Sequence, residues 1–181
     1  MIKEFIICMS LMDMNGVVNQ ENICNNIDSL HEVSKKYKVD SDLYVSMMWV
    51  ESNFKTNIRS YTGKACGISQ VIPKWTRPRM TCKELNQNPG KAMEQGARIY
   101  SLFKPYARGK DDINLCAYNQ GYRCKGEKGE KYVKSGMGYA KKVKKFRRRL
   151  KREIRRKNKE YKSLMIYKEK LLRAISSIYK L

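Results

Sequence analysis

Residues 44–54 read YVSMMWVESNF, an apolar run that carries one acid, Glu51, near its end. The apolar residues recur at helical spacing, and Asp40 or Ser41 is suited to begin a helix as its N-cap. The pattern predicts a helix over residues 41–50 that ends near Glu51. A carboxyl among apolar side chains loses hydration, which raises its pKa toward values useful for a general acid. A water-exposed glutamate at a helix end is the alternative, and this run alone does not decide between the two.

Helical spacing continues on both sides of this run and favours a mostly helical protein. Further helices are predicted over residues 27–37, 91–103 and 113–118, with loops around one short helix over residues 60–78. Another loop is predicted over residues 105–112. No segment alternates apolar and polar residues as a half-buried strand would, and no internal repeat is visible. The predicted fold class is therefore mostly α.

The length and composition predict one compact domain with an appendage. The chain has 181 residues, of which 41% are hydrophobic and 31% are charged. No stretch approaches the roughly 20 apolar residues that span a bilayer, so no transmembrane anchor is expected. The formal net charge of +22 exceeds what solubility needs and predicts a polyanionic partner.

The positive charge is concentrated at the C-terminal end of the chain. Residues 141–181 carry a net charge of +15, whereas residues 1–140 carry only +7. Apolar residues of the basic segment recur at three- and four-residue steps without proline or glycine, which predicts one long basic amphipathic helix. The chain is thus divided into an N-terminal segment (1–25), a helical domain (26–140) and a basic tail (141–181).

Residues 1–14, MIKEFIICMSLMDM, have two interpretations. One is a short secretory signal. However, Glu4 offsets the charge of Lys3, and no small-residue cleavage site follows the apolar run. A buried or partner-binding segment is therefore favoured.

The cysteines are even in number but form no C-x-x-C pair, which disfavours a zinc site. Many pairings are open to them, and both disulfides outside the cytosol and buried free thiols are consistent with the sequence. The lone His31 is expected on a helix surface without a ligand role. No metal and no cofactor are predicted. The six cysteines are Cys8, Cys24, Cys66, Cys82, Cys116 and Cys124.

The segment after Glu51 is unusual for a glycosidase because it lacks acids. No Asp or Glu occurs between Ser52 and Lys83, whereas glycosidases generally place two carboxylates beside the scissile bond. Glu51 must therefore act alone unless a later acid folds back onto it. The candidates are Glu84, Glu94, Asp111 and Asp112.

Four short motifs, each weak by itself, occur in a characteristic order. They are Glu51-Ser52, GISQ at residues 67–70 with Pro73 downstream, AYNQG at residues 117–121, and Tyr139 with Val143. In this order they resemble the lytic transglycosylases of the soluble-lytic-transglycosylase and goose-type lysozyme-like group, over residues 27–145. Ser69 departs from the methionine of the family, which affects the expected sugar contacts but not the turn around Gly67.

The resemblance implies a lysozyme-like helical domain that cleaves the β-1,4 bond between N-acetylmuramic acid and N-acetylglucosamine in peptidoglycan. Glu51 would first protonate the glycosidic oxygen. The same carboxylate would then accept the proton of the muramic C6 hydroxyl as this hydroxyl closes onto C1. The product would be a 1,6-anhydro sugar, and no second carboxylate is needed.

The resemblance also assigns residues that bind the substrate. Gln70 and Asn119 would offer amides to sugar hydroxyl and N-acetyl groups, and Tyr118 would pack beside a sugar. Tyr139 would hydrogen-bond near the catalytic carboxyl and orient it, and Ser52 would hold either the substrate or the end of the catalytic helix. For the two tyrosines, core packing is the alternative.

The predicted partners are peptidoglycan glycan strands and, for residues 141–181, something anionic: nucleic acid, a membrane surface, or virion protein in a larger assembly. The AYNQG form resembles transglycosylases carried in bacteriophage particles, which implies a virion protein that acts in the bacterial cell envelope during infection. The bacterial periplasm, as part of a secretion or conjugation system, is the alternative location.

Two other functions stay open. A hydrolytic lysozyme would need an ordered water and usually a second acid. A non-catalytic component would bind glycan or nucleic acid through its basic tail. The presence of Glu51 together with Gln70 and Asn119 favours an enzyme.

Overall fold

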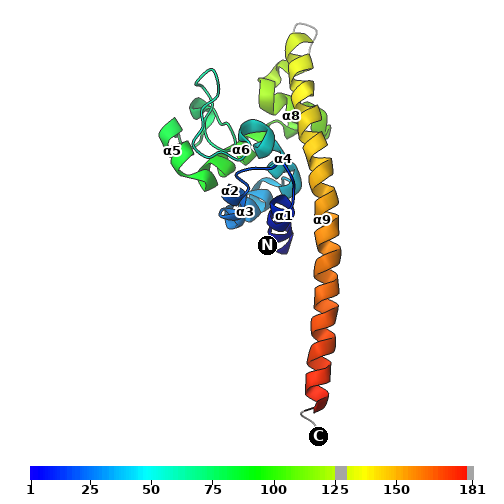
Figure 1. Ribbon diagram of the computed structural model, residues 1–181. Coiled ribbons are helices and arrows are strands. Elements are labelled where there is room, and N and C mark those ends of the chain that lie inside the picture. The colour runs from blue at the N-terminus through cyan, green and yellow to red at the C-terminus, as the bar shows by residue number, and fades with distance from the viewer. Residues whose placement is uncertain (125–129, 179–181) are drawn as a thin grey trace.

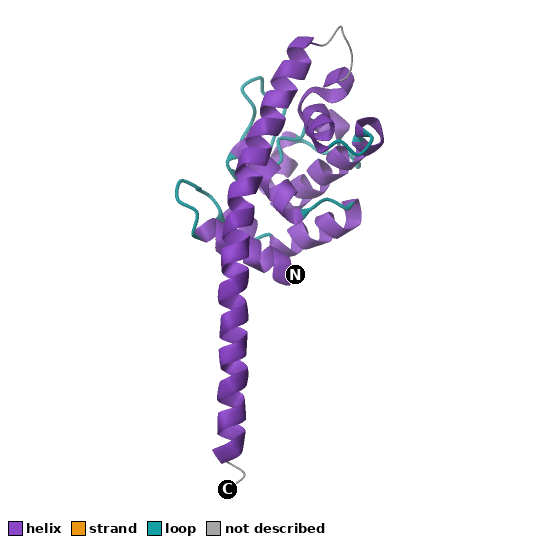
Figure 2. Cartoon of the chain, turned by 90° about the vertical axis from the view of Figure 1, so that its right-hand side faces the viewer, coloured by secondary structure: helices purple, strands orange, loops and turns teal. Residues whose placement is uncertain are grey.

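The computed structural model describes residues 1–124 and 130–178 and confirms the mostly α class predicted from the sequence. One helix, α9, forms a long rod, and the shorter helices gather on one side of its N-terminal half (Figures 1 and 2). The last three residues of the predicted tail lie outside the described part of the chain. None of the described helices is long and apolar enough to cross a membrane.

The elements follow one another as helices joined by short loops. Among the described residues, β pairing is limited to isolated bridges that join Cys66 to Arg59 and to Val71. The elements are α1 (Ile2–Met12), α2 (Glu21–Cys24), α3 (Ile27–Tyr37), α4 (Ser41–Ser52), η1 (Pro73–Trp75), α5 (Cys82–Gln87), α6 (Pro89–Leu102), α7 (Lys104–Ala107), α8 (Asp111–Gln120), η2 (Gly121–Cys124) and α9 (Glu130–Ile178).

The helices predicted from spacing agree with the structure in the centre of the chain, but one predicted loop contains a short helix. Helix α3 coincides with the predicted helix over residues 27–37, and α4 begins at Ser41 and ends at Ser52, next to Glu51, as predicted. The predicted loop over residues 105–112 is wrong in part, because its first residues belong to helix α7 (Lys104–Ala107), in whose first turn proline is well tolerated at Pro105. Its missing amide proton leaves no bond unmade in the first turn of α7.

Helix α9 begins at Glu130, before the predicted start of the tail at Lys141. Gly136 lets it approach α8 closely, since a Cβ at this position would lie 2.3 Å from the Sγ of Cys116. Val143, on the same helix, is fully buried in the core of the domain. The predicted boundary between domain and tail therefore falls inside a helix whose inner face is core.

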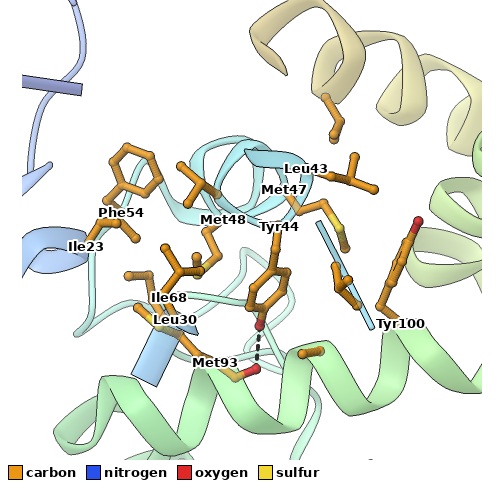
Figure 3. Packing of buried hydrophobic residues seen from close by; sticks show 14 of the residues in the cluster. Ile23, Leu30, Leu43, Tyr44, Met47, Met48, Phe54, Ile68, Met93 and Tyr100 are labelled. Atoms are coloured by element: carbon orange, nitrogen blue, oxygen red, sulfur yellow. Dashed lines mark hydrogen bonds between the residues drawn. The ribbon is translucent and has the colours of Figure 1, made fainter. Parts of the chain in front are cut away.

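Helix α4 lies at the centre of this core (Figure 3). Met47 and Met48 are almost completely buried and lie on two sides of α4, with Met48 on the side of Leu30 and Ile68. The hydroxyl of Tyr44 donates a hydrogen bond to the carbonyl of Met93 at 2.5 Å. Because α4 is enclosed on nearly every side, the residues of its last turn are held in place by the whole core.

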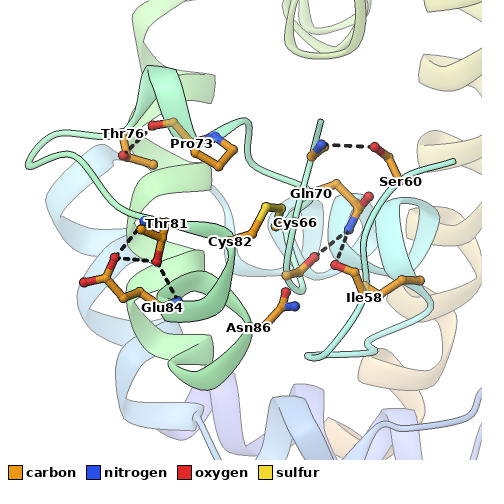
Figure 4. Close-up of a disulfide and its surroundings, with 12 residues drawn as sticks. Ile58, Ser60, Cys66, Gln70, Pro73, Thr76, Thr81, Cys82, Glu84 and Asn86 are labelled. Carbon is orange, nitrogen blue, oxygen red and sulfur yellow. Dashed lines mark hydrogen bonds between the residues drawn. A yellow bond between two sulfur atoms is a disulfide. The ribbon is translucent and has the colours of Figure 1, made fainter. Parts of the chain in front are cut away.

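Three disulfides decide the cysteine question that the sequence left open. Cys8 pairs with Cys24, Cys66 with Cys82, and Cys116 with Cys124. The Cα atoms of the pairs are 5.3, 5.4 and 5.8 Å apart, within the usual range for disulfides. The second pair joins the loop before η1 to the first residue of α5 (Figure 4).

The N-terminal helix α1 is part of the globular domain, in agreement with the favoured prediction of a buried segment. Ile7 and Leu11 are fully buried in the core. The hydroxyl of Ser41 donates to Oε1 of Glu4 at 2.7 Å, which ties α1 to the beginning of α4. His31 was expected to be a simple surface residue, but its Nδ1 lies 3.1 Å from Oε2 of Glu4.

Candidate active site

Glu51 lies in the last turn of α4 and is partly buried. Burial raises the pKa of its carboxyl from the ordinary 4.5 to about 7. The helix ends immediately afterwards, because Asn53 and Phe54 adopt left-handed backbone conformations with φ of 52° and 63°. The apolar environment expected from the sequence is therefore present, and the alternative of a fully exposed helix-terminal glutamate is not.

The hydroxyl of Tyr139 is the polar group that acts on this carboxyl. Its interaction with Glu51 lowers the pKa of the carboxyl and so opposes part of the effect of burial. The hydroxyl is itself buried and forms no hydrogen bond of ordinary geometry with any described residue, Glu51 included. Burial raises the pKa of Tyr139 well above its usual value, so the phenol stays protonated and can donate toward Glu51.

Two more tyrosines complete the surroundings of Glu51. The hydroxyl of Tyr118 donates to the carbonyl of Ser69 at 2.7 Å, and the hydroxyl of Tyr44 lies 2.9 Å from Oγ of Ser69. Burial raises the pKa of both phenols, and the charge of Glu51 raises each further. Tyr44 was not predicted as a site residue, although it lies two helical turns before Glu51 on the same face of α4.

The hydroxyl of Ser52 is engaged within the protein. It is buried and donates to the carbonyl of Ile68 at 2.7 Å and to that of Met48 at 3.1 Å. The sequence left two roles open for Ser52, contact with the substrate or with the end of helix α4. Of the two roles considered, it has the second, because it ties the end of the catalytic helix to the loop that carries Ile68 and Ser69.

The side-chain amide of Gln70 forms hydrogen bonds with carbonyl groups of the protein near the same loop (Figure 4). Its Nε2 donates to the carbonyl of Gly67 at 2.9 Å and to that of Ile58 at 3.5 Å. Only its amide oxygen is left for a sugar. The turn around Gly67 forms as expected: Gly67 has φ of +74°, and a Cβ there would lie 2.9 Å from the carbonyl oxygen of Leu85.

The two site residues predicted in the AYNQG motif, Tyr118 and Asn119, differ in their burial. Tyr118 is partly buried and packs against Tyr100, with ring centroids 6.3 Å apart. Asn119 is exposed, and its Oδ1 accepts a hydrogen bond from Gln120 at 2.5 Å. Tyr118 thus lies beside the site and also packs in the core, whereas the Asn119 amide is exposed and accessible to a ligand.

None of the four other acids considered reaches Glu51. No carboxylate of the described residues contributes to the pKa shift of Glu51. Each of the four is engaged elsewhere: Glu84 caps α5 with Thr81, Glu94 pairs with Lys36, Asp111 lies near Arg147, and Asp112 pairs with Lys144.

The motifs that meet at Glu51 also match a known family. Residues 28–139 match the family model described as the transglycosylase SLT domain. The chain belongs to this family. It is a lytic transglycosylase, an enzyme that cleaves peptidoglycan as a lyase.

Curated relatives of this lytic transglycosylase come from Escherichia coli. One protein named X polypeptide is 27% identical over 150 residues, covering 78% of this chain and 82% of the relative. An X polypeptide of strain K12 is 26% identical over 130 residues, covering 67% of this chain and 72% of the relative. No solved structure was found to match.

The transglycosylase domain brings together side chains from α4, α8, α9 and the Gly67 loop. Glu51, Tyr118 and Tyr139 come from three different helices and interact electrostatically in one site. Within residues 1–124 and 130–178, no cluster of three or more His, Cys, Asp or Glu side chains could hold a metal ion. The site offers a carboxyl with a raised pKa beside protonated phenols, a combination suited to proton transfer.

Proposed function

We propose that Glu51 is both the general acid and the general base of a peptidoglycan transglycosylase that forms a 1,6-anhydromuramic product. The observation that carries the proposal is the state of the carboxyl. Glu51 has a pKa of about 7 in a site where no second described carboxylate influences it. A carboxyl poised near neutrality serves as acid and as base with similar ease.

In the first step, protonated Glu51 donates its proton to the glycosidic oxygen between N-acetylmuramic acid and N-acetylglucosamine. The C1–O bond breaks and positive charge develops at C1 of the muramic sugar. The carboxylate that remains stabilises this charge, and the Tyr139 hydroxyl holds its orientation. Positioned proton transfer of this kind contributes on the order of 10²–10⁴-fold to a rate.

In the second step, the muramic C6 hydroxyl attacks C1, and the Glu51 carboxylate accepts its proton. The enzyme returns to its starting state, and the new C6–O–C1 bond closes the anhydro ring. The nucleophile is part of the substrate, so its effective concentration is high and no second carboxylate has to activate water. The absence of acids from residues 52–83 is consistent with this route.

The test is mass spectrometry of soluble products from purified peptidoglycan, with the unmodified enzyme and its Glu51→Gln variant. We expect anhydro-muropeptides from the unmodified enzyme alone. The matched control is Glu84→Gln, which removes a carboxyl that only caps α5 and should leave the products unchanged. Products with reducing ends would instead identify a hydrolytic lysozyme. The lack of any product from the unmodified enzyme would favour a non-catalytic binding component.

We propose further that the enzyme acts in the bacterial cell envelope and that residues 141–181 meet an anionic partner there. The three disulfides support a location outside the reducing cytosol. Transport in a phage virion, which the AYNQG motif suggested, and a role in a secretion or conjugation system stay predictions. Purification of intact particles followed by immunodetection of this chain distinguishes the two.

A further inference from the structure

Among the cations of helix α9, two groups differ in their partners. One group faces acids of the domain and forms ion pairs. Its members are Lys144, Arg147, Lys151, Arg156 and Lys157. The other group, called the outer row here, forms no ion pair with any described residue, and all its members are exposed. It consists of Lys141, Lys145, Arg148, Arg152, Arg155, Lys159 and Lys162.

The outer row is straight because its spacing alternates between four and three residues. A helix drifts by only about 20° per seven residues at this spacing, so the seven cations stay on one side. From Lys141 to Lys162 the row is about 32 Å long, at a rise of about 1.5 Å per residue. No acid lies within it, because Glu153 and Glu160 belong to another face and pair with Arg156.

The outer row points away from the domain. The buried residues of α9, such as Val143, Phe146 and Leu150, lie about half a helical turn from it. Figure 1 shows the domain on one side of α9 only, and Figure 2 views the rod with the domain behind it. A flat surface could therefore meet the whole row without touching the domain.

From this geometry we propose that the outer row of α9 docks the enzyme on an anionic phospholipid bilayer. The seven cations of the outer row lie in line and match a plane of negative headgroups. Each cation is attracted to the headgroups when it lies within about a Debye length of the membrane surface, and each attraction adds to the binding free energy. The choice of a bilayer over nucleic acid rests on the proposed action in the cell envelope. Docked in this way, the catalytic domain faces away from the membrane.

The test is sedimentation of the full chain with phosphatidylcholine vesicles that do or do not contain phosphatidylglycerol. The variant carries Arg148→Glu, Arg152→Glu and Arg155→Glu, which reverses the centre of the row. The matched control carries Lys35→Glu, Lys64→Glu and Lys110→Glu, an equal change of net charge at exposed cations outside α9.

We expect the unmodified chain and the matched control to bind anionic vesicles and to release them at high salt. The outer-row variant should bind on the order of 10²-fold more weakly. Equal binding by this variant would overturn the proposal. So would equal binding to neutral vesicles, which would indicate insertion of apolar side chains. Tighter row-dependent binding to duplex DNA than to anionic vesicles at physiological salt would make nucleic acid the partner.

Vesicle binding is independent of the catalytic proposal. The Glu51→Gln variant should sediment with anionic vesicles like the unmodified chain, because Glu51 lies on the domain side of α9 near Tyr139. The outer-row variant should keep its thermal unfolding midpoint and its activity on purified peptidoglycan. A loss of either would mean that the row supports the fold, and the docking proposal would then be wrong.

Discussion

The two faces of helix α9 use the same residue types for different purposes. On the inner face, Arg147 lies 2.8 Å from Oδ2 of the buried Asp42 and 2.6 Å from Oδ2 of Asp40. On the outer face, Arg148 is exposed and forms no ion pair with a described residue. Arg147 and Arg148 are adjacent in the sequence, but they lie on different faces of the helix, and only Arg147 is paired with acids of the domain. The lesson is that net charge overstates the charge available to a partner, because part of it is already balanced by the domain.

The largest expected difference between the faces concerns apolar contacts. Phe146 stacks on Trp49 with ring centroids 4.4 Å apart and is 3% exposed. Phe146→Ala should lower the free energy of unfolding by about 3–5 kcal/mol, because it leaves a cavity between α4 and α9. Leu164→Ala, at an exposed position farther along α9, should change it by less than about 0.5 kcal/mol. Urea denaturation measures both, and similar values would contradict the division of α9 into two environments.

The ion pairs should show a smaller contrast. Arg147→Ala leaves Asp42 buried with only Lys151 and Lys3 nearby, at 3.5 and 3.9 Å. We expect a loss of about 2–4 kcal/mol, less than for an isolated buried charge because these lysines remain. The matched control Arg148→Ala should stay within about 0.5 kcal/mol of the unmodified chain. If both variants unfold at the same denaturant concentration, the inner ion pairs have no structural role.

A third prediction concerns Glu51, which the inner face of α9 covers. Its pKa of about 7 in the folded state exceeds the ordinary value of 4.5, so the folded state holds more protons between these values. Stability should therefore fall as the pH rises from about 4.5 to about 7. Glu51→Gln should abolish this loss and be more stable at pH 8 by on the order of 1–3 kcal/mol. The two proteins should be about equally stable at pH 4, and a constant difference at both pH values would count against a raised pKa.

The smallest expected effect is a shift of a pH profile. The Tyr139 hydroxyl lowers the pKa of Glu51, so Tyr139→Phe should raise that pKa above its value of about 7. The alkaline limb of the kcat/KM profile, which reports deprotonation of the general acid, should then move to higher pH. A purely structural role of Tyr139 predicts lower activity with an unchanged limb. Tyr132→Phe, at an exposed tyrosine of the same helix, is the control.

Local patterns in the sequence predicted the central helices and the carboxyl of Glu51 in an apolar environment, but not what surrounds them. The apolar spacing before Glu51 was sufficient for α4, because helical periodicity depends on near neighbours. Tyr44 was missed because its spacing signals core, and its contact with Ser69 of the Gly67 loop joins distant segments. The role of Ser52 was left open between the substrate and the helix end, because a dipeptide motif does not show where a hydroxyl points.

By itself, the sequence determined the mostly helical class, the position of Glu51 and the basic character of the C-terminal helix. Only the tertiary structure decided which cysteines pair, that four other acids are engaged away from Glu51, and which cations of α9 form no ion pair with the described residues. The physical reason is the range of the interactions. Periodicity and charge are properties of adjacent residues. Disulfide pairing and the burial of a carboxyl, by contrast, depend on surfaces that meet only when the chain has folded.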